Sequence, residues 1–230
     1  LRQIFWISFV GSTLQYGMTF TGLSMLDASL AIIIIHLEVP FSVLLAAIIL
    51  KDNPGIQRIL GMLISFAGIV LIAGQPSLSG QLYAILLTAA GAMMWAVGQV
   101  MVKRLKNPPS GFALTAWIGV FSGPQMILGS FIFEDSQLES LSNASWIGWG
   151  VILYLALIMT VLGYGIWYSV LSRNPVSKVM PVMLLLPVFT IASSMFFLGE
   201  HPSLMIFMGA AVVIGGVSMI VITKDSKLSS

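Results

Sequence analysis

Long apolar segments alternate with short polar connections along almost the whole chain. A helix rises about 1.5 Å per residue, so about 20 residues cross a hydrocarbon core of about 30 Å. Lipid-exposed backbone must satisfy its own hydrogen bonds, which favours helices over open strands. The pattern therefore predicts an all-α polytopic membrane protein. Eight transmembrane helices are expected, at Ile4–Leu23, Ala28–Leu50, Ile59–Ala73, Leu82–Val102, Phe112–Phe133, Trp146–Leu171, Val176–Leu198 and Leu204–Thr223.

Composition supports this class and excludes others. The chain is 58% hydrophobic and only 8% charged, whereas soluble domains are about 25% charged. It contains no cysteine, so disulfides and thiolate metal sites are excluded. The chain carries no HExxH, GxSxG or phosphate-loop motif. We therefore expect no enzyme activity, no cofactor and no metal, and any transport would not be driven by nucleotide hydrolysis.

Basic residues define the two sides of the membrane. If alternate connections lie on alternate sides, all ten Lys and Arg share the side of Arg2. The positive-inside rule makes that side cytoplasmic, and both ends of the chain lie there. Because these residues flank apolar segments, they predict topology and not a nucleic-acid partner. Besides Arg2, the basic residues on this side are Lys51, Arg58, Lys103, Arg104, Lys106, Arg173, Lys178, Lys224 and Lys227.

An internal repeat relates the two halves. Tyr16-Gly17 recurs as Tyr164-Gly165, and Pro40 meets Pro187 with one residue of slip. Segments one to three thus match segments six to eight, but the two sets begin on opposite sides of the membrane. This pattern is typical of the inverted-topology repeats of secondary transporters. Further matches at the offset of the tyrosines are Asp52 with Glu200, Gly61 with Gly209 and Gly68 with Gly216.

Segments four and five have no counterpart in the first set. The complete repeat is therefore expected to hold five helices and the complete protein ten, with two helices missing before Leu1. On this interpretation residues 1–74 are the remainder of the first repeat, and residues 81–223 are the second.

Two stretches carry a family resemblance. They are Trp-Ala-Val-Gly-Gln at 95–99, and Gly-Tyr-Gly-Ile-Trp at 163–167 with the later Gly199-Glu200. The chain resembles the EamA branch of the drug/metabolite transporter superfamily over essentially its whole length. In the first half, Lys51-Asp52 stands where the family has Gly-Glu. The resemblance implies ten helices in two inverted halves, a bacterial inner-membrane location and export of small metabolites.

Glu38 is the only acid inside a predicted span. A charge at the bilayer centre costs about 3 kcal/mol on insertion scales, and such residues are usually functional. Pro40 removes a backbone donor and clashes with the carbonyl of His36, so a kink is expected. Glu38 is interpreted either as a protonatable coupling group or substrate ligand, or as a neutral carboxyl bonding a freed carbonyl. His36 lies about 200° away around the helix, and is either a site residue or a packed hydrogen bonder.

Aromatic and amide side chains within the spans pose a similar choice. Trp95 and Gln99 share a helix face with Gly91 and Gly98. That face is either the wall of a small-molecule pocket or a helix-packing surface. The same alternatives hold for Gln15, Tyr16, Tyr164, Trp167 and Tyr168. The residues interpreted as structural are the kink prolines Pro40 and Pro187 and the packing glycines Gly61, Gly68, Gly209 and Gly216.

Together these features predict a secondary transporter that exports small amino-acid-like metabolites by alternating access. Its expected partners are a small-molecule substrate and the lipid bilayer, with protons as a further candidate. Glu38 and His36 would sense protons or substrate. One alternative is a non-transporting sensor or partner subunit that binds through its glycine seams, and another is an inactive truncated remnant.

Overall fold

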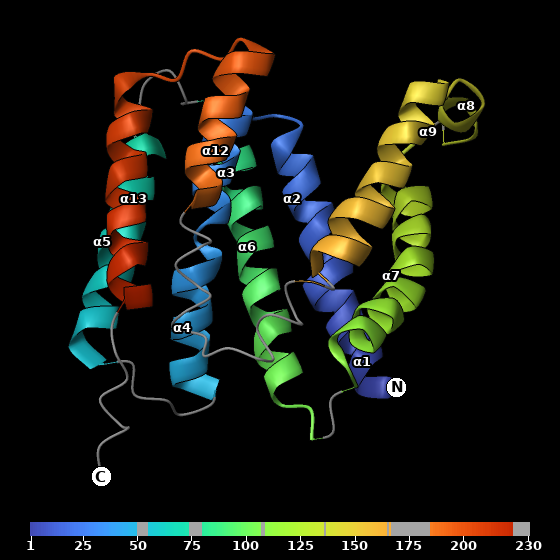
Figure 1. The fold of residues 1–230 in the computed structure, drawn as a ribbon, viewed down its shortest axis with the longest axis horizontal. Coiled ribbons are helices and arrows are strands. Elements are labelled where there is room, and N and C mark those ends of the chain that lie inside the picture. Colours follow the sequence, from blue (N-terminus) through green and yellow to red (C-terminus); the bar gives the residue numbers. More distant parts are fainter. Residues whose placement is uncertain are drawn as a thin grey trace.

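The computed structural model describes residues 1–49, 55–73, 80–106, 109–135, 137–164, 166 and 185–222. All regular structure in these ranges is helical (Figure 1), which confirms the predicted class. The elements are α1 (Arg2–Ser8), η1 (Phe9–Leu14), α2 (Gln15–Leu23), α3 (Ala28–Ile35), α4 (Glu38–Ile49), α5 (Gly55–Ala73), α6 (Leu82–Lys103), α7 (Gly111–Phe133), α8 (Gln137–Ser142), α9 (Trp146–Leu153), η3 (Tyr154–Tyr164), α12 (Leu185–Ser193), η5 (Ser194–Leu198) and α13 (Leu204–Ile222). The η elements are π-helical.

Six helices of the described ranges are long and apolar enough to cross a membrane. The predicted count of eight is therefore not confirmed. The first predicted span is helical from Arg2 to Leu23 but is not among the six. It carries several polar side chains that face other helices, for example Ser8, whose hydroxyl donates to the Ile118 carbonyl at 3.0 Å. Of the seventh predicted span only the part from Leu185 onward lies within the described residues.

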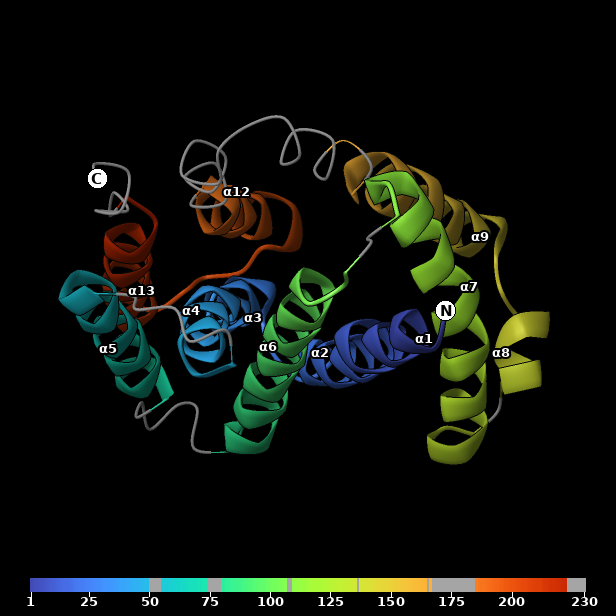
Figure 2. The same cartoon turned by 90° about the horizontal axis from the view of Figure 1, so that it is seen from below.

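Helices α5 and α13 form a close antiparallel pair (Figures 1 and 2). A Cβ at Gly61 would lie 2.6 Å from the Gly216 carbonyl oxygen, and one at Gly68 would lie 3.1 Å from that of Gly209. Between these contacts the Ser65 hydroxyl donates to the Val213 carbonyl at 3.4 Å, across 148 residues of sequence. That separation is the repeat offset, so equivalent positions of the two halves meet at this seam. The predicted inverted repeat would require its corresponding helices to run in opposite directions.

A second glycine seam joins α6 to η1 and α2. A Cβ at Gly11 would lie 2.9 Å from the Gly98 Cα. Further along the same pair of helices, Gly91 faces the Thr19 hydroxyl and Gly22 faces the Thr88 hydroxyl. Small residues let helix backbones approach closely in membranes, where dispersion replaces the hydrophobic effect as the main attraction. This seam fixes the face of α6 that is presented to the neighbouring helices.

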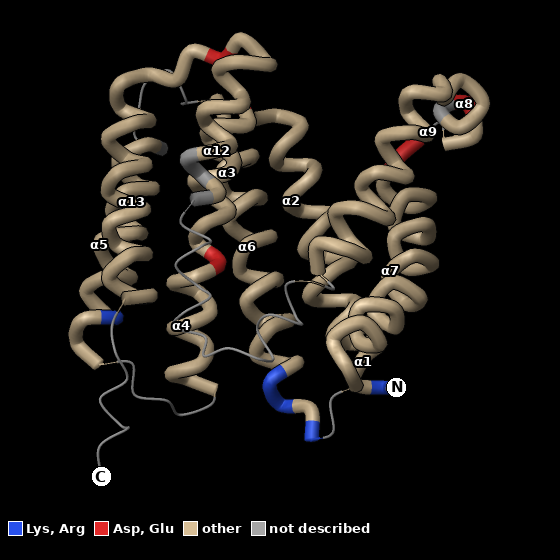
Figure 3. Tube along the Cα trace, in the orientation of Figure 1, with Lys and Arg blue, Asp and Glu red and all other residues tan. Residues whose placement is uncertain are grey.

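Charged residues separate to the two ends of the helices (Figure 3). The described Lys and Arg lie at what we term the basic end, which includes the start of α1 and the end of α6. The described acids lie at the opposite, acidic end, except for Glu38 in the first turn of α4. The predicted loop at 134–145 lies at the acidic end and contains the short helix α8. Within the described residues, the separation agrees with the predicted sidedness.

Glu200 joins two distant segments at the acidic end. The backbone N–H groups of Ala28 and Ser29 donate to its carboxylate at 2.7 and 3.1 Å, which caps the start of α3. Gly199, with φ of +67°, ends η5 in the left-handed conformation that favours glycine. Burial alone would raise the pKa of Glu200, but hydrogen bonds from Ser29, Ala28 and Ser194 outweigh it and lower the pKa. Through Glu200, the Gly-Glu motif of the second half therefore caps helix α3 of the first half.

We expect Glu200→Gln to lower the apparent melting temperature by about 2–4 °C at neutral pH, as loss of a cap does in a chain of this size. An amide offers only one acceptor oxygen to the two N–H groups. Because the folded-state pKa is lowered, the stabilisation is present above the ordinary glutamate range and is lost as pH falls below it. The wild-type and variant melting curves should converge in acid.

Glu134→Gln is the matched control, because Glu134 lies at the same end and its bonded partner, Ser130, is on the same helix. Melting would be followed by fluorescence in detergent. An equal loss of stability in both variants would contradict a specific capping role for Glu200.

Candidate functional site

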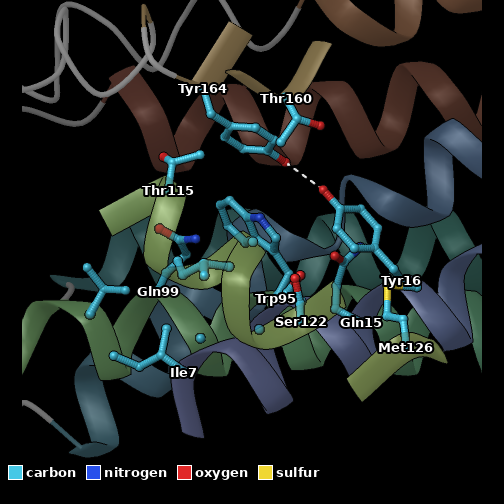
Figure 4. A pocket seen from close by; sticks show the side chains of 16 residues that line it. Ile7, Gln15, Tyr16, Trp95, Gln99, Thr115, Ser122, Met126, Thr160 and Tyr164 are labelled. Carbon is cyan, nitrogen blue, oxygen red and sulfur yellow. Dashed lines mark hydrogen bonds between the residues drawn. The ribbon is translucent and has the colours of Figure 1, made fainter. Parts of the chain in front are cut away.

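A cavity of about 240 Å³ lies between η1–α2, α6, α7 and η3. Figure 4 shows its side chains converging from these elements. Five of the residues singled out in the sequence line it, namely Gln15, Tyr16, Trp95, Gln99 and Tyr164. Trp167 and Tyr168 lie outside the described residues, as does the side chain of Pro187.

One face of α6 both packs against neighbouring helices and lines the cavity, the two roles between which the sequence left a choice. Gly91 and Gly98 pack against α2 and η1. Trp95 and Gln99 lie between and beside these contacts and line the cavity. The tight glycine seam therefore sets how far the indole and the amide project toward α7 and η3.

The two repeat-equivalent tyrosines meet across the cavity. The hydroxyl oxygens of Tyr16 and Tyr164 are 3.5 Å apart, and either can donate (Figure 4). The Tyr16 ring stacks on Phe20, with centroids 5.5 Å apart. A hydrogen bond within the same helix orients Gln15, because its Nε2 donates at 3.3 Å to the hydroxyl of Thr19, four residues later. These contacts hold polar groups from the first set of helices against those of η3.

Several lining residues were missed from the sequence. Ser12, Thr115, Ser122 and Thr160 each contribute to the cavity wall. Serine and threonine in membrane helices often bond their own backbone, as Thr115 does with the Gly111 carbonyl at 2.9 Å, so their type alone carries little signal. One signal was available for two of them: Ser12 and Thr160 are separated by the repeat offset of the tyrosine pair.

The described lining residues are neutral, and most of the surface that they expose to the cavity is apolar, with hydroxyl and amide groups set into it. Hydroxyl and amide groups both donate and accept hydrogen bonds, and Trp95 and Met126 add apolar surface. Gln99 and Val102 lie near the end of α6 at Lys103, and Thr115 lies near the start of α7. The cavity thus extends from the level of the tyrosine pair toward the basic end.

His36 and Glu38 lie elsewhere. Both are buried, with 2% and 9% of their surface exposed, and neither is among the described residues that line the cavity. They flank the interruption between α3 and α4, where the Leu37 N–H donates to the Ile34 carbonyl at 3.0 Å and the Val39 N–H to the His36 carbonyl at 3.2 Å. The His36 Nδ1 lies 2.9 Å from the Ile32 carbonyl. The predicted site residues that the structure describes thus fall into two groups, five at the cavity and two at this helix break.

The model of the EamA-like transporter family matches residues 1–74 and 82–222. The chain belongs to the EamA-like transporter family. Its match covers nearly all of the described helices, including every element that lines the cavity. The EamA assignment makes this chain a multi-pass membrane transporter, in agreement with its six apolar helices.

Relatives of the EamA chain include two proteins that are named as probable efflux pumps. A "Probable amino-acid metabolite efflux pump" of Salmonella typhimurium is 29% identical over 217 residues, which is 91% of this chain and 70% of that protein. The protein of the same name from Escherichia coli is 28% identical over 211 residues, covering 88% and 70%. The uncharacterized transporter YyaM of Bacillus subtilis is 30% identical over 203 residues, covering 86% and 66%.

A solved crystal structure shares the fold. It superimposes with a TM-score of 0.63 over 93% of this chain and 74% of that chain, at 19% identity. At this identity the likeness shows the fold alone.

Proposed function

We propose that this EamA-family protein is a secondary transporter that exports small amino-acid-like metabolites from the cytoplasm by alternating access. The observation that carries the proposal is the cavity, which lies where helices of the two repeats meet and gathers neutral hydrogen-bonding groups around Trp95. Transporter sites commonly lie near the bilayer midplane at such a repeat interface. The names of the two efflux-pump relatives support the same substrate class.

Cavity size favours a small solute. The cavity has a volume of about 240 Å³. Pockets for drug-sized ligands begin at about 300 Å³. Hydroxyls and amides can accept from an ammonium and donate to a carboxylate, and an indole face also attracts a cation. A zwitterionic amino acid fits this mixture of groups.

Charge indicates which end of the cavity faces the cytoplasm. By the positive-inside rule the basic end is cytoplasmic, and the cavity extends toward that end. On this proposal the structure corresponds to a state that loads substrate from the cytoplasm. Glu38, in the broken helix α3–α4, is the proposed proton-responsive group and would couple to the cavity through α6, which packs against α4.

The alternative of a sensor that recruits a partner through its glycine seams is less favoured. Gly61, Gly68, Gly209 and Gly216 pack against one another between α5 and α13. These faces are therefore used within the chain.

A flux assay tests the proposed function. Purified protein in liposomes would be loaded with radiolabelled L-serine, L-threonine or L-methionine, with L-lysine and L-glutamate as charged comparators. We expect at least one zwitterionic amino acid to leave faster than from protein-free liposomes, and Trp95→Ala with Gln99→Ala to reduce that flux. Efflux equal to that of protein-free liposomes for every solute tested would contradict the proposal.

A further inference from the structure

Four hydroxyl groups of the cavity form two repeat-related pairs. Tyr16 and Tyr164 are separated by 148 residues, and Ser12 and Thr160 have the same separation. All four line the cavity. We term Ser12, Tyr16, Thr160 and Tyr164 the hydroxyl quartet.

Local structure reproduces the pairing. Ser12 lies within the π-helical segment η1, four positions before Tyr16, and Thr160 lies within the π-helical segment η3, four positions before Tyr164. The wider turn is visible at Thr160, whose hydroxyl donates to the Leu155 carbonyl five residues earlier, at 2.9 Å. π-helical turns are rare and are frequent at functional sites. Residues four apart share a helix face, so Ser12 lies on the face of Tyr16 and Thr160 on the face of Tyr164, and all four line the cavity.

Inverted repeats relate the two orientations of a transporter. If the halves exchange conformations between the inward-open and outward-open states, each residue of one repeat takes the environment of its equivalent. In a set made of equivalent pairs, the two members of each pair therefore exchange environments, and the same side chains surround the cavity in both states. Gln99, Thr115 and Ser122 have no partner at the 148-residue offset within this sequence, so they do not belong to such a set of equivalent pairs.

We propose that the hydroxyl quartet is the substrate-contacting set in both orientations, and that it takes a solute with hydrogen-bonding groups at two ends, as a zwitterionic amino acid has. This inference rests on the proposed transport function. The close approach of the tyrosine hydroxyls places the two halves of the set within reach of one small solute. A hydroxyl oxygen can accept from an ammonium, and a hydroxyl hydrogen that is not already donated within the protein can bond a carboxylate. The Thr160 hydrogen is donated to the Leu155 carbonyl, so Thr160 acts on the solute as an acceptor.

Matched substitutions test the set with L-serine as the probe. Removing one neutral hydrogen bond changes affinity by about three- to tenfold. We expect that increase in the KM for L-serine efflux from each of Ser12→Ala, Thr160→Val, Tyr16→Phe and Tyr164→Phe, with similar values within a pair. Thr88→Val is the control, because Thr88 is buried against Gly22 and away from the cavity. A KM change confined to one member of each pair would overturn the proposal.

A second measurement needs no substrate. The chain has no cysteine, so Ser12→Cys and Thr160→Cys can each be treated with a membrane-impermeant methanethiosulfonate from one face at a time. We expect both positions to react from both faces, and the buried seam control Ser65→Cys to react from neither. Reaction of either cavity position from one face only, or from none, overturns the proposal. Labelling needs no flux, so absent efflux together with labelling from both faces would count against the proposed substrate class, whereas labelling from one face would count against the hydroxyl quartet.

Discussion

Replacing Gly216 by alanine is expected to destabilise the protein by about 3 kcal/mol, the upper range for overpacking, and to lower the apparent melting temperature by about 6–12 °C. The added Cβ would lie 2.5 Å from the Gly61 carbonyl oxygen and 2.6 Å from the Ser65 backbone nitrogen. Both atoms belong to the backbone of α5, so no rotamer change relieves the clash. The helices must separate, and their close contact is what holds them together in lipid.

Gly215 supplies the matched control on the same helix. A Cβ there meets no atom within 4 Å, and alanine is the better helix former by about 1 kcal/mol. We expect Gly215→Ala to melt at or slightly above the wild-type temperature. Thermal unfolding in detergent, followed by tryptophan fluorescence, compares the two variants directly. Equal melting temperatures for both would show that α5 and α13 are not in close contact.

Glu38→Gln is expected to leave folding and membrane insertion intact while reducing export by about tenfold or more, or removing its dependence on pH. The amide has the shape of the carboxyl group and retains hydrogen bonding, but it cannot release a proton. The side chain is buried at the start of α4, beside the interruption at His36 and Leu37. Ser42 also bonds the backbone carbonyl of Glu38, at 2.6 Å, and the substitution leaves that contact unchanged.

Flux of the same amino acid would be measured in liposomes across a series of external pH values. Glu134→Gln provides the comparison, because it removes an exposed acid at the end of α7. We expect that variant to keep the wild-type pH profile. A wild-type rate and pH profile in Glu38→Gln would limit Glu38 to a local structural role at the helix break.

Local pattern was sufficient for most of the described helices and for the separation of charges between their two ends. Apolar length predicted helices whose described ends differ by only a few residues, such as Leu82–Lys103 for the predicted Leu82–Val102. Such lengths are set by the bilayer and by backbone satisfaction, which act on each segment separately. The number of membrane spans was harder to predict. The segment Arg2–Leu23 carries polar side chains that line the cavity, so it departs from the apolar pattern of a simple span.

By itself, the sequence determined the all-helical membrane class, the separation of charges and the repeat that pairs Tyr16 with Tyr164. Only the tertiary structure decided which faces meet. It brought Gly61 against Gly216, gathered Ser12, Thr115 and Thr160 beside Trp95, and left Glu38 at a helix break apart from the cavity. The physical reason is that helix contacts in a membrane depend on the fit of small residues on two surfaces at once. That fit is a property of the pair, and neither segment carries it alone.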